Sequence, residues 1–464
     1  MQILKQIFKS QYIIGTLFYS FPSFFSIIIS LISIPIFLKF SSPEDYSNFL
    51  ISHFVLTIAI ITNLNIGKIT TINIAKKKIS HLNIFFTSII FTFLFSFLFT
   101  LLIFLLFLSI INYFQLSAIK ELTDLKILLG LFLTNIYLTL EGYYKGSLNY
   151  KLLSFFNLFF YSISLSIPSF FVLYNININI FFISLIVKFI VVIAMFIFVL
   201  NKLNNYKFKY SKSFADDCIN NLKWMTLNTF LNQIYNYLDK YLIKIFLDNL
   251  IFIYYTISQQ ITSKLGDPLL AYNNIFIAKT FKKNKNENNN LSYSSVFYCI
   301  YIFTSFLFLY LFLDTLLKFW LGSAYSIKYF ELIKVFFLIT TLGSYSKMII
   351  DYYDIANKSK QSSKIELLFL IPFVGGIIFS IINQNVYYFL FLILFKELIT
   401  LAARFYYIKN LFYFRKFIYI QLILIIFNSF SWFYNLDNIY FILLQFLHLI
   451  FFLPFKGLRN FYKI

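Results

Sequence analysis

Four polar side chains form a stripe along an apolar segment, residues 224–247, that is long enough to be a membrane helix. They are Asn228, Asn232, Tyr235 and Asp239, with Asn236 beside them. The spacings of +4, +3 and +4 place the four on one helix face. Asp239 lies roughly 12 Å from the end of the segment, where a carboxylate must be paired, hydrated or protonated. The stripe predicts either a water-filled cavity or a polar lock between helices.

A second stripe consists of Ser23, Ser26, Ser30 and Ser33 in the first apolar segment, residues 12–38. The spacings of +3, +4 and +3 again select one helix face. Small hydroxyl side chains there either line a hydrated path or allow close helix packing. Both stripes lie on the first helix of a predicted half, and this shared position favours the cavity.

Several lysines lie within apolar segments: Lys188, Lys240, Lys244, Lys264, Lys334 and Lys396. Each one alone is explained by snorkelling or by structural pairing, for example with Glu397. As a set they could make a cavity positive, which would suit a lipid diphosphate because lysine binds phosphate as a point charge. We expect Lys240 and Lys264 to supply positive charge near the path that such a diphosphate would take through the cavity.

The composition requires a membrane environment. Of 464 residues, 60% are hydrophobic and only 12% are charged, against about 25% charged in soluble domains. A soluble enzyme and a nucleic-acid-binding chain are therefore excluded, despite the net charge of +21. The two cysteines, Cys218 and Cys299, and the three dispersed histidines indicate no disulfide framework and no metal site.

Hydropathy predicts an all-α, polytopic membrane protein with fourteen spans. The domains expected are a six-helix lobe (1–200), a basic cytoplasmic linker (201–223), a second six-helix lobe (224–408) and an extra helix pair (409–464). The expected spans are 12–38, 48–66, 84–111, 125–141, 152–173, 180–200, 224–247, 250–275, 293–317, 329–350, 365–383, 386–408, 417–434 and 439–455.

The distribution of basic residues predicts the orientation. With both termini in the cytoplasm, 28 of the 39 lysines and arginines fall in cytoplasmic segments and 5 in outer loops, as the positive-inside rule requires. The two halves also carry a weak repeat at an offset of 203 residues, which aligns 72–76 with 275–279 and Asp45 with Asp248. Repeated halves around a central cavity are a common transporter plan.

Known catalytic motifs are missing from the sequence. It has no phosphate loop of the GxxxxGK[ST] type, no nucleophile elbow and no HExxH pattern. The predicted outer loops are short, and the longest, 112–124, could not hold a catalytic domain. We therefore expect a transporter and not an enzyme.

Three segments resemble the polysaccharide-exporter flippases of the O-antigen (Wzx) type, in the superfamily that also contains drug/cation antiporters and the lipid II flippase. Residues 39–47 (KFSSPEDYS) resemble the family's LGPEDYG turn, and 65–75 resemble its GL…A…R.IA segment without the arginine. Residues 232–258 are similar to N…DR…G.Y, with Lys240 in place of arginine. Lys68 is the nearest substitute for the missing arginine.

The resemblance implies a two-lobed flippase that moves undecaprenyl-diphosphate-linked oligosaccharide, such as an O-antigen, lipopolysaccharide or capsule repeat unit, across the bacterial inner membrane by alternating access. The implied partners are the lipid-linked glycan, membrane lipids, a glycan polymerase and a chain-length regulator. No cofactor is expected beyond a coupling cation, H⁺ or Na⁺, for which Asp239 is a candidate. The alternatives are a drug/cation antiporter, which would want acidic cavity groups, and a membrane glycan polymerase.

Overall fold

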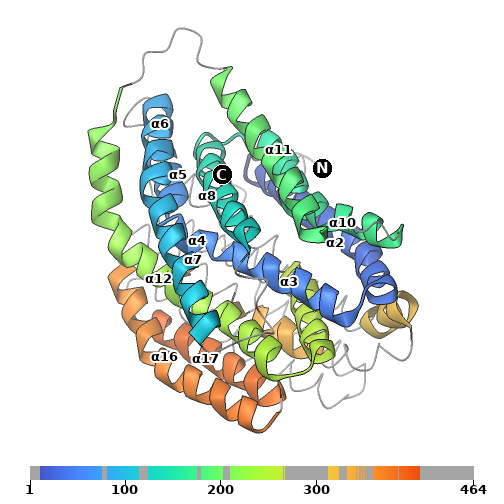
Figure 1. The fold of residues 1–464 in the computed structure, drawn as a ribbon. Helices are drawn as coiled ribbons and strands as arrows, with labels where there is room; N and C mark the ends of the chain where they lie inside the picture. The colour runs from blue at the N-terminus through green and yellow to red at the C-terminus, as the bar shows by residue number, and fades with distance from the viewer. Residues whose placement is uncertain are drawn as a thin grey trace, which may run out of the picture.

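The chain is represented by a computed structural model (Figure 1), and every regular element in its described part is a helix. The described residues are 11–75, 81–113, 124–174, 179–201, 209–264, 266, 312–322, 332–340, 342–343, 346, 349–350, 359–384 and 386–407. The expected all-α fold class is confirmed. The expected spans 417–434 and 439–455 lie outside these residues.

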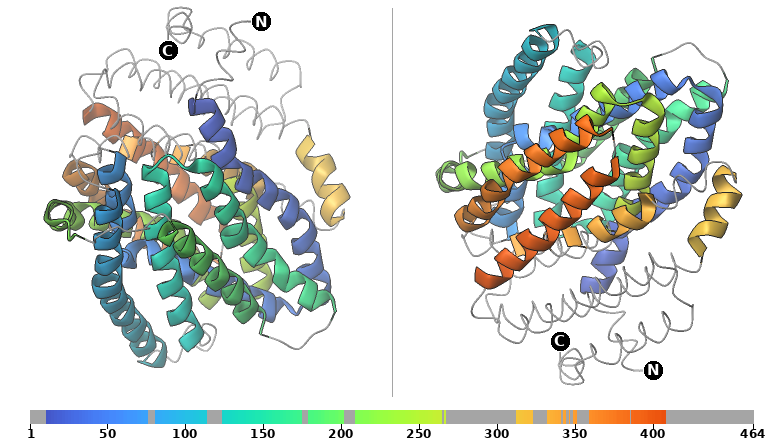
Figure 2. Two further views of the ribbon diagram at one scale, coloured as in Figure 1. Left: turned by 90° about the horizontal axis from the view of Figure 1, so that it is seen from above. Right: turned by 90° about the horizontal axis from the view of Figure 1, so that it is seen from below.

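The N-terminal half contains six of the expected spans, several of them built from more than one helical element. They are α2 (Gln11–Phe40), α3 (Pro43–Thr57), α4 (Ala59–Thr62), α5 (Ile66–Ala75), α6 (His81–Phe91), the π-helix η1 (Thr92–Ser96), α7 (Phe97–Tyr113), α8 (Leu125–Gly146), α9 (Tyr150–Asn157), the π-helix η3 (Leu158–Ile163), α10 (Ser164–Leu173) and α11 (Ile180–Leu200). Viewed from above and below, α2 packs alongside α10 (Figure 2).

The C-terminal half is described by α12 (Lys212–Phe246), α16 (Ser359–Ile382) and α17 (Val386–Tyr407), with helical stretches at 249–264, 312–321 and 332–340. Helix α16 packs between α12 and α17. It continues through Pro372, Gly375 and Gly376, as membrane helices tolerate because neighbouring groups satisfy the freed backbone.

Helix α12 begins within the segment that we assigned to a linker. Ser211 caps it by accepting a hydrogen bond from the Phe214 backbone N–H at 3.3 Å. Phe214 and Cys218 are fully buried in an apolar cluster with α6, α8 and α11. The basic composition of 201–223 concealed these buried positions, so only the first part of that segment precedes the helix.

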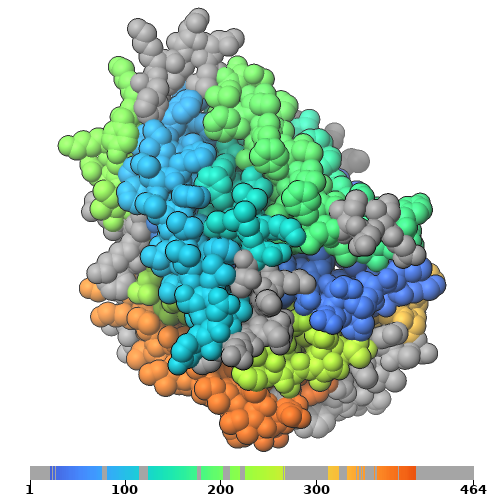
Figure 3. All heavy atoms as spheres, in the orientation of Figure 1, coloured from blue at the N-terminus to red at the C-terminus, as the bar shows by residue number. Residues whose placement is uncertain are grey.

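Seven helices in the described part are long and apolar enough to cross a membrane. The helix pair α6–α7 is the most lipid-like, since Leu98, Leu102 and Leu106 of α7 are all more than half exposed. Helices α7 and α11 cover the face of the N-terminal half that is seen in Figure 3, and α16 lies at its lower edge. Exposed leucines of this density are explained by contact with lipid.

The second span is broken between α4 and α5. Leu64 and Asn65 have φ of 54° and 57°, a left-handed conformation that non-glycine residues rarely adopt. The break is held by Asn63, whose Oδ1 accepts a hydrogen bond from the Gly67 N–H at 3.0 Å. Broken helices inside a membrane occur where backbone lines a cavity or is buried in protein.

Glycines bring α5 and α8 into backbone contact. A Cβ on Gly142 would lie 2.2 Å from the Gly67 carbonyl oxygen, and one on Gly146 would lie 2.9 Å from the Thr71 carbonyl oxygen. The close approach allows the Thr71 hydroxyl to donate to the Gly142 carbonyl at 3.1 Å. This seam fixes the charged end of α8, which carries Glu141 and Lys145, beside the break in the second span.

Candidate functional site

A cavity of about 600 Å³ lies between the two halves. Its N-terminal wall is formed by the 63–71 region and the end of α8, and its C-terminal wall by α12, the 259–266 and 336–350 regions and α17. The charged side chains among the described lining residues are Lys68, Glu141, Lys145, Lys240, Lys396 and Glu397. Lysines therefore outnumber carboxylates, and they occur on both walls.

Amide side chains make up much of the remaining polar lining. They are Asn63, Asn65, Asn228, Asn232, Gln233, Asn236, Gln259 and Gln260. Asn228 is buried, and its Oδ1 has no hydrogen-bond partner. Asn65 pairs across the halves with Thr229 of α12 at 3.0 Å. Amides donate and accept hydrogen bonds without carrying charge, which suits hydroxyl-rich ligands.

The lysines of the cavity have different partners. Lys145 forms an ion pair with Glu141 at 3.1 Å, one helical turn away on α8. Lys240 instead donates to the Asn236 carbonyl at 2.5 Å, and its Nζ lies 3.9 Å from the Tyr237 ring centre and 4.7 Å from that of Phe54. Among the described residues, no carboxylate lies within ion-pair distance of Lys240 Nζ. The groups in direct contact with its ammonium are a carbonyl and two ring faces.

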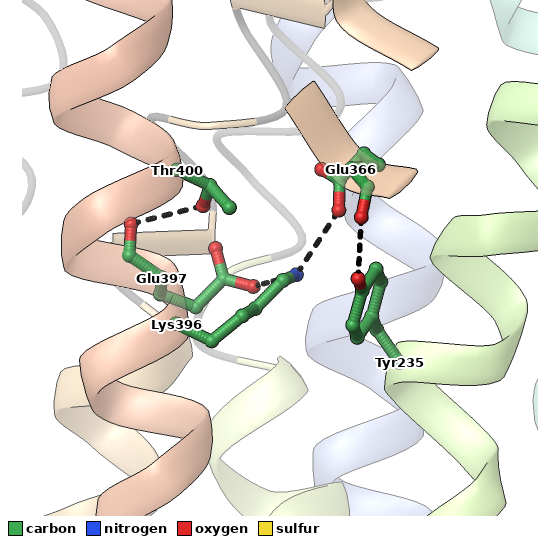
Figure 4. Close-up of polar contacts among 5 residues, drawn as sticks. All are labelled: Tyr235, Glu366, Lys396, Glu397 and Thr400. Carbon is green, nitrogen blue, oxygen red and sulfur yellow. Dashed lines mark hydrogen bonds and ion pairs between the residues drawn. The ribbon is translucent and has the colours of Figure 1, made fainter. Parts of the chain in front are cut away.

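Lys396 is held by two carboxylates on the C-terminal wall (Figure 4). Its Nζ lies 2.7 Å from Glu397 Oε1 and 3.6 Å from Glu366 Oε2. The Tyr235 ring centre lies 3.9 Å from the same ammonium, and the Tyr235 hydroxyl donates to the Glu366 carbonyl at 2.6 Å. Of the two alternatives expected for each lysine, snorkelling or pairing with an acid such as Glu397, Lys396 shows pairing, and Glu366 is a further partner that sequence spacing did not indicate.

Asp239 occupies a different place from the one expected. It is buried and is not among the residues that line the cavity. Its carboxylate accepts hydrogen bonds from the Tyr255 hydroxyl and from the Lys240 backbone N–H. The carboxylate is tolerated because Tyr255 on the following helix pairs with it, which the spacing along α12 could not reveal.

The remaining expected site residues divide into two groups. Asn228, Asn232, Tyr235, Lys240 and Lys68 line the cavity. Lys264 is partly buried and is not among the lining residues, and neither are Ser26 and Ser30 of α2. Helix α2 packs against α9, η3 and α10, where the Ser162 hydroxyl donates to the Pro22 carbonyl. Its serine stripe therefore lies within the N-terminal half, while the Ser23 side chain lies outside the described part.

Sequence patterns alone did not identify the polar residues that α8 and the break in the second span contribute to the cavity. Glu141 and Lys145 were assigned to the end of a span and a loop, although their i, i+4 spacing was visible. Asn65 and Gly67 were noted only as part of a motif. Lys244 was expected to snorkel, but it is buried and donates to Ser47 and Asn249.

Metal binding has no support in the described residues, where no group of three or more His, Cys, Asp or Glu side chains is placed to hold an ion. The chemistry available to the cavity is instead anion binding by lysines and hydrogen bonding by amides. Outside the predicted spans, burial raises the pKa of the Cys218 thiol, so that group is unreactive.

Comparison with known proteins identifies solved structures that have the same fold. No family model matches the chain, and no curated protein matches it. Solved structures match over nearly their whole length, at a sequence identity that shows the fold alone. A multidrug resistance MATE family transporter of the MOP superfamily, in an outward-facing conformation, is 14% identical with a TM-score of 0.61, covering 87% of this chain and 96% of that one.

Two further structures give the same result. A mutant of the Vibrio cholerae MATE transporter VcmN is 13% identical with a TM-score of 0.65, covering 87% of this chain and 96% of that one. A MOP superfamily transporter from Pyrococcus furiosus, described by the reverse polarity of its binding pocket, is 13% identical with a TM-score of 0.61, covering 86% and 96%. The chain is an all-helical, polytopic membrane protein with the MATE/MOP fold.

Proposed function

We propose that this protein is a flippase that moves undecaprenyl-diphosphate-linked oligosaccharide from the cytoplasmic to the outer leaflet of a bacterial inner membrane. The observation that carries the proposal is the cavity between the halves, where lysines outnumber carboxylates among the described lining residues. The glycan leaves the protein unchanged in length and linkage, and both termini lie in the cytoplasm. A glycan polymerase and a chain-length regulator act on the exported units.

The lining lysines come from both walls of the cavity. Lys68 and Lys145 belong to the N-terminal wall, and Lys240 and Lys396 to the C-terminal wall. A diphosphate between them would bridge the halves, because each ammonium binds phosphate oxygens as a point charge. Amides such as Asn228, beside this path, suit the hydroxyl groups of the adjoining sugars.

The shape of the interface supports alternating access. The halves are packed together by apolar residues at the end of the molecule where α2 meets α3, whereas the cavity extends toward the other end. Transport then requires the packed end to open and the cavity end to close.

A drug/cation antiporter is the second candidate, because the chain shares its fold with a multidrug resistance transporter. The cavity chemistry favours it less. Both described carboxylates of the lining, Glu141 and Glu397, are already held by lysines, which leaves little free negative charge for a cationic ligand in the described part of the lining. The Pyrococcus furiosus relative, whose pocket polarity is described as reversed with a different function suggested, is a precedent for such divergence within this fold.

The test is transport in proteoliposomes. We expect purified protein to move a fluorescent undecaprenyl-diphosphate-linked oligosaccharide to the opposite leaflet, where an impermeant quencher detects it. Lys240→Gln should reduce the rate about tenfold or more, as expected when a desolvated charge contact with phosphate is lost. The exposed Lys318→Gln, whose partner is Asp314, is the matched control and should leave the rate unchanged.

Two outcomes would contradict the proposal. Efflux of a cationic dye without movement of the lipid-linked glycan would establish the antiporter. A longer glycan in the presence of this protein alone would establish a polymerase.

A further inference from the structure

The Lys396 ammonium is in contact with two carboxylates. Glu397, at 2.7 Å, lies on the cavity wall, and Glu366, at 3.6 Å, is completely buried behind it. By contrast, Lys240 faces the same cavity with a carbonyl and two aromatic rings as its neighbours. The two lysines of the C-terminal wall are therefore not equivalent as anion-binding groups.

The pairing of Lys396 with Glu397 requires a specific conformation. Adjacent residues on a helix point about 100° apart, so they do not normally face each other. Figure 4 shows the Lys396 side chain directed toward α16, where its ammonium meets Glu366, with the Glu397 carboxylate turned toward it. Tyr235 stabilises this arrangement from α12, because its hydroxyl is anchored on Glu366 and its ring lies against the ammonium.

We propose that Lys396 is a gated subsite for the second phosphate of the substrate, and that Glu397 and Glu366 compete with phosphate oxygens for its ammonium. This inference rests on the proposed function and goes beyond it by naming which lysine is gated and which groups gate it. Phosphate and carboxylate oxygens make the same charge-assisted contact with an ammonium group. A diphosphate that reaches Lys396 must therefore displace Glu397.

Competition between the carboxylates and phosphate for the Lys396 ammonium would help release of the substrate during transport. A cavity that held a diphosphate with every lysine free would bind tightly in both orientations and release slowly. Intramolecular carboxylates lower the affinity without removing the cation, and they reoccupy Lys396 as the substrate leaves. Binding thus exchanges one ion pair of Lys396 for another, and the displaced Glu397 carboxylate remains on the cavity wall.

Binding of inorganic pyrophosphate to the purified full-length protein in nanodiscs, followed by calorimetry, tests the proposal. We expect Glu397→Gln to bind pyrophosphate about tenfold more tightly, equivalent to about 1.4 kcal/mol, because the competitor is neutral but of the same shape. Lys396→Gln should bind about tenfold more weakly. Neither substitution should change the binding of inorganic orthophosphate by more than twofold, because a single phosphate can use the other lysines.

Controls separate this subsite from general electrostatics. Asp314→Asn removes a carboxylate from the exposed pair with Lys318 and should leave pyrophosphate affinity unchanged. Size-exclusion profiles and thermal unfolding confirm that each variant is folded. Undecaprenyl diphosphate supplied in the nanodisc should show the same ranking of variants if the lipid-linked form is the source of the diphosphate.

The outcomes distinguish the two proposals. If the wild-type protein binds pyrophosphate and the Lys396→Gln and Glu397→Gln variants bind it with the same affinity, the gated subsite is overturned and the flippase proposal stays intact. Wild-type protein that binds neither pyrophosphate nor the lipid diphosphate overturns both.

Discussion

The two ends of the interface between the halves differ in chemistry. At the end where α2 meets α3, which we call the closed end, buried residues of both halves form one apolar cluster that includes Phe37, Tyr46, Phe252 and Ile253. Toward the other end, the facing surfaces carry lysines and amides around the cavity. Apolar burial thus holds the halves together at the closed end, and the start of α12 makes a second apolar contact with the N-terminal half through Phe214 and Cys218.

Three polar contacts strengthen the closed end. Buried Lys244 of α12 donates to the Ser47 hydroxyl at 2.5 Å and to Asn249 Oδ1 at 2.7 Å, and the Ser47 hydroxyl also lies 3.2 Å from Asn249 Oδ1. Ser47 and Asn249 lie 202 residues apart, close to the predicted repeat offset of 203. The residues near 45 and near 248, which occupy equivalent positions in the predicted repeat, are therefore in contact with each other. Opening of the closed end must break this contact.

The largest effect is expected from locking the closed end. Cysteines in place of Ser47 and Asn249, in a background where Cys218 and Cys299 are replaced by alanine, should form a disulfide on oxidation. Transport of the lipid-linked glycan should then stop and return on reduction, because the halves cannot separate. Each single cysteine is the control, and transport that continues with the cross-link formed would show that this end does not open.

The next largest effect concerns the wall of the cavity. Gly142→Ala places a Cβ 2.2 Å from the Gly67 carbonyl oxygen, so α5 and α8 must separate at a cost of about 1–3 kcal/mol or more. We expect a clear drop in the thermal unfolding temperature in detergent. Gly375→Ala, which meets no atom within 4 Å, should be neutral or slightly stabilising. Equal changes in unfolding temperature for Gly142→Ala and Gly375→Ala would show that close packing of α5 against α8 does not stabilise the protein.

A moderate effect is expected at Asp239. Asp239→Ala leaves the buried Tyr255 hydroxyl without its acceptor, at a cost of about 1–3 kcal/mol, and the isosteric Asp239→Asn should recover part of the stability. In the cysteine-free background, cysteines at 232 and 236 should react with a water-soluble thiol reagent and one at 239 should not. Rapid labelling of a cysteine at 239 would show that this position faces the cavity and would contradict the buried placement of Asp239.

The smallest effect is a shift in how often the closed end opens. Lys244→Gln removes the charged contacts to Ser47 and Asn249, worth about 1 kcal/mol of net stabilisation. A cysteine at Ile34, which is buried in the apolar cluster, should then be labelled about fivefold faster. Lys39→Gln, outside that cluster on the same helix, is the control, and an unchanged labelling rate would show that Lys244 does not hold the closed end.

Much of the architecture followed from local pattern. Runs of apolar residues determined where the described membrane helices lie, because a membrane helix must satisfy its backbone internally and expose apolar side chains. The expected segment 125–141 was short and 365–383 was interrupted by a proline and glycines, yet they formed α8 and α16. The spacing along α12 also identified Asn228, Asn232 and Tyr235, which line the cavity.

Tertiary structure decided what each polar residue does. Asp239 and Lys240 are adjacent in sequence, but a helix points them in different directions, so one is bound by Tyr255 and the other faces the cavity. Glu366 and Lys396 are thirty residues apart and meet only because α16 packs against α17. The sequence determined that these charges lie within the membrane. Which carboxylate neutralises which lysine depended on helix packing, because a buried charge is stabilised by whatever partner the neighbouring helix supplies.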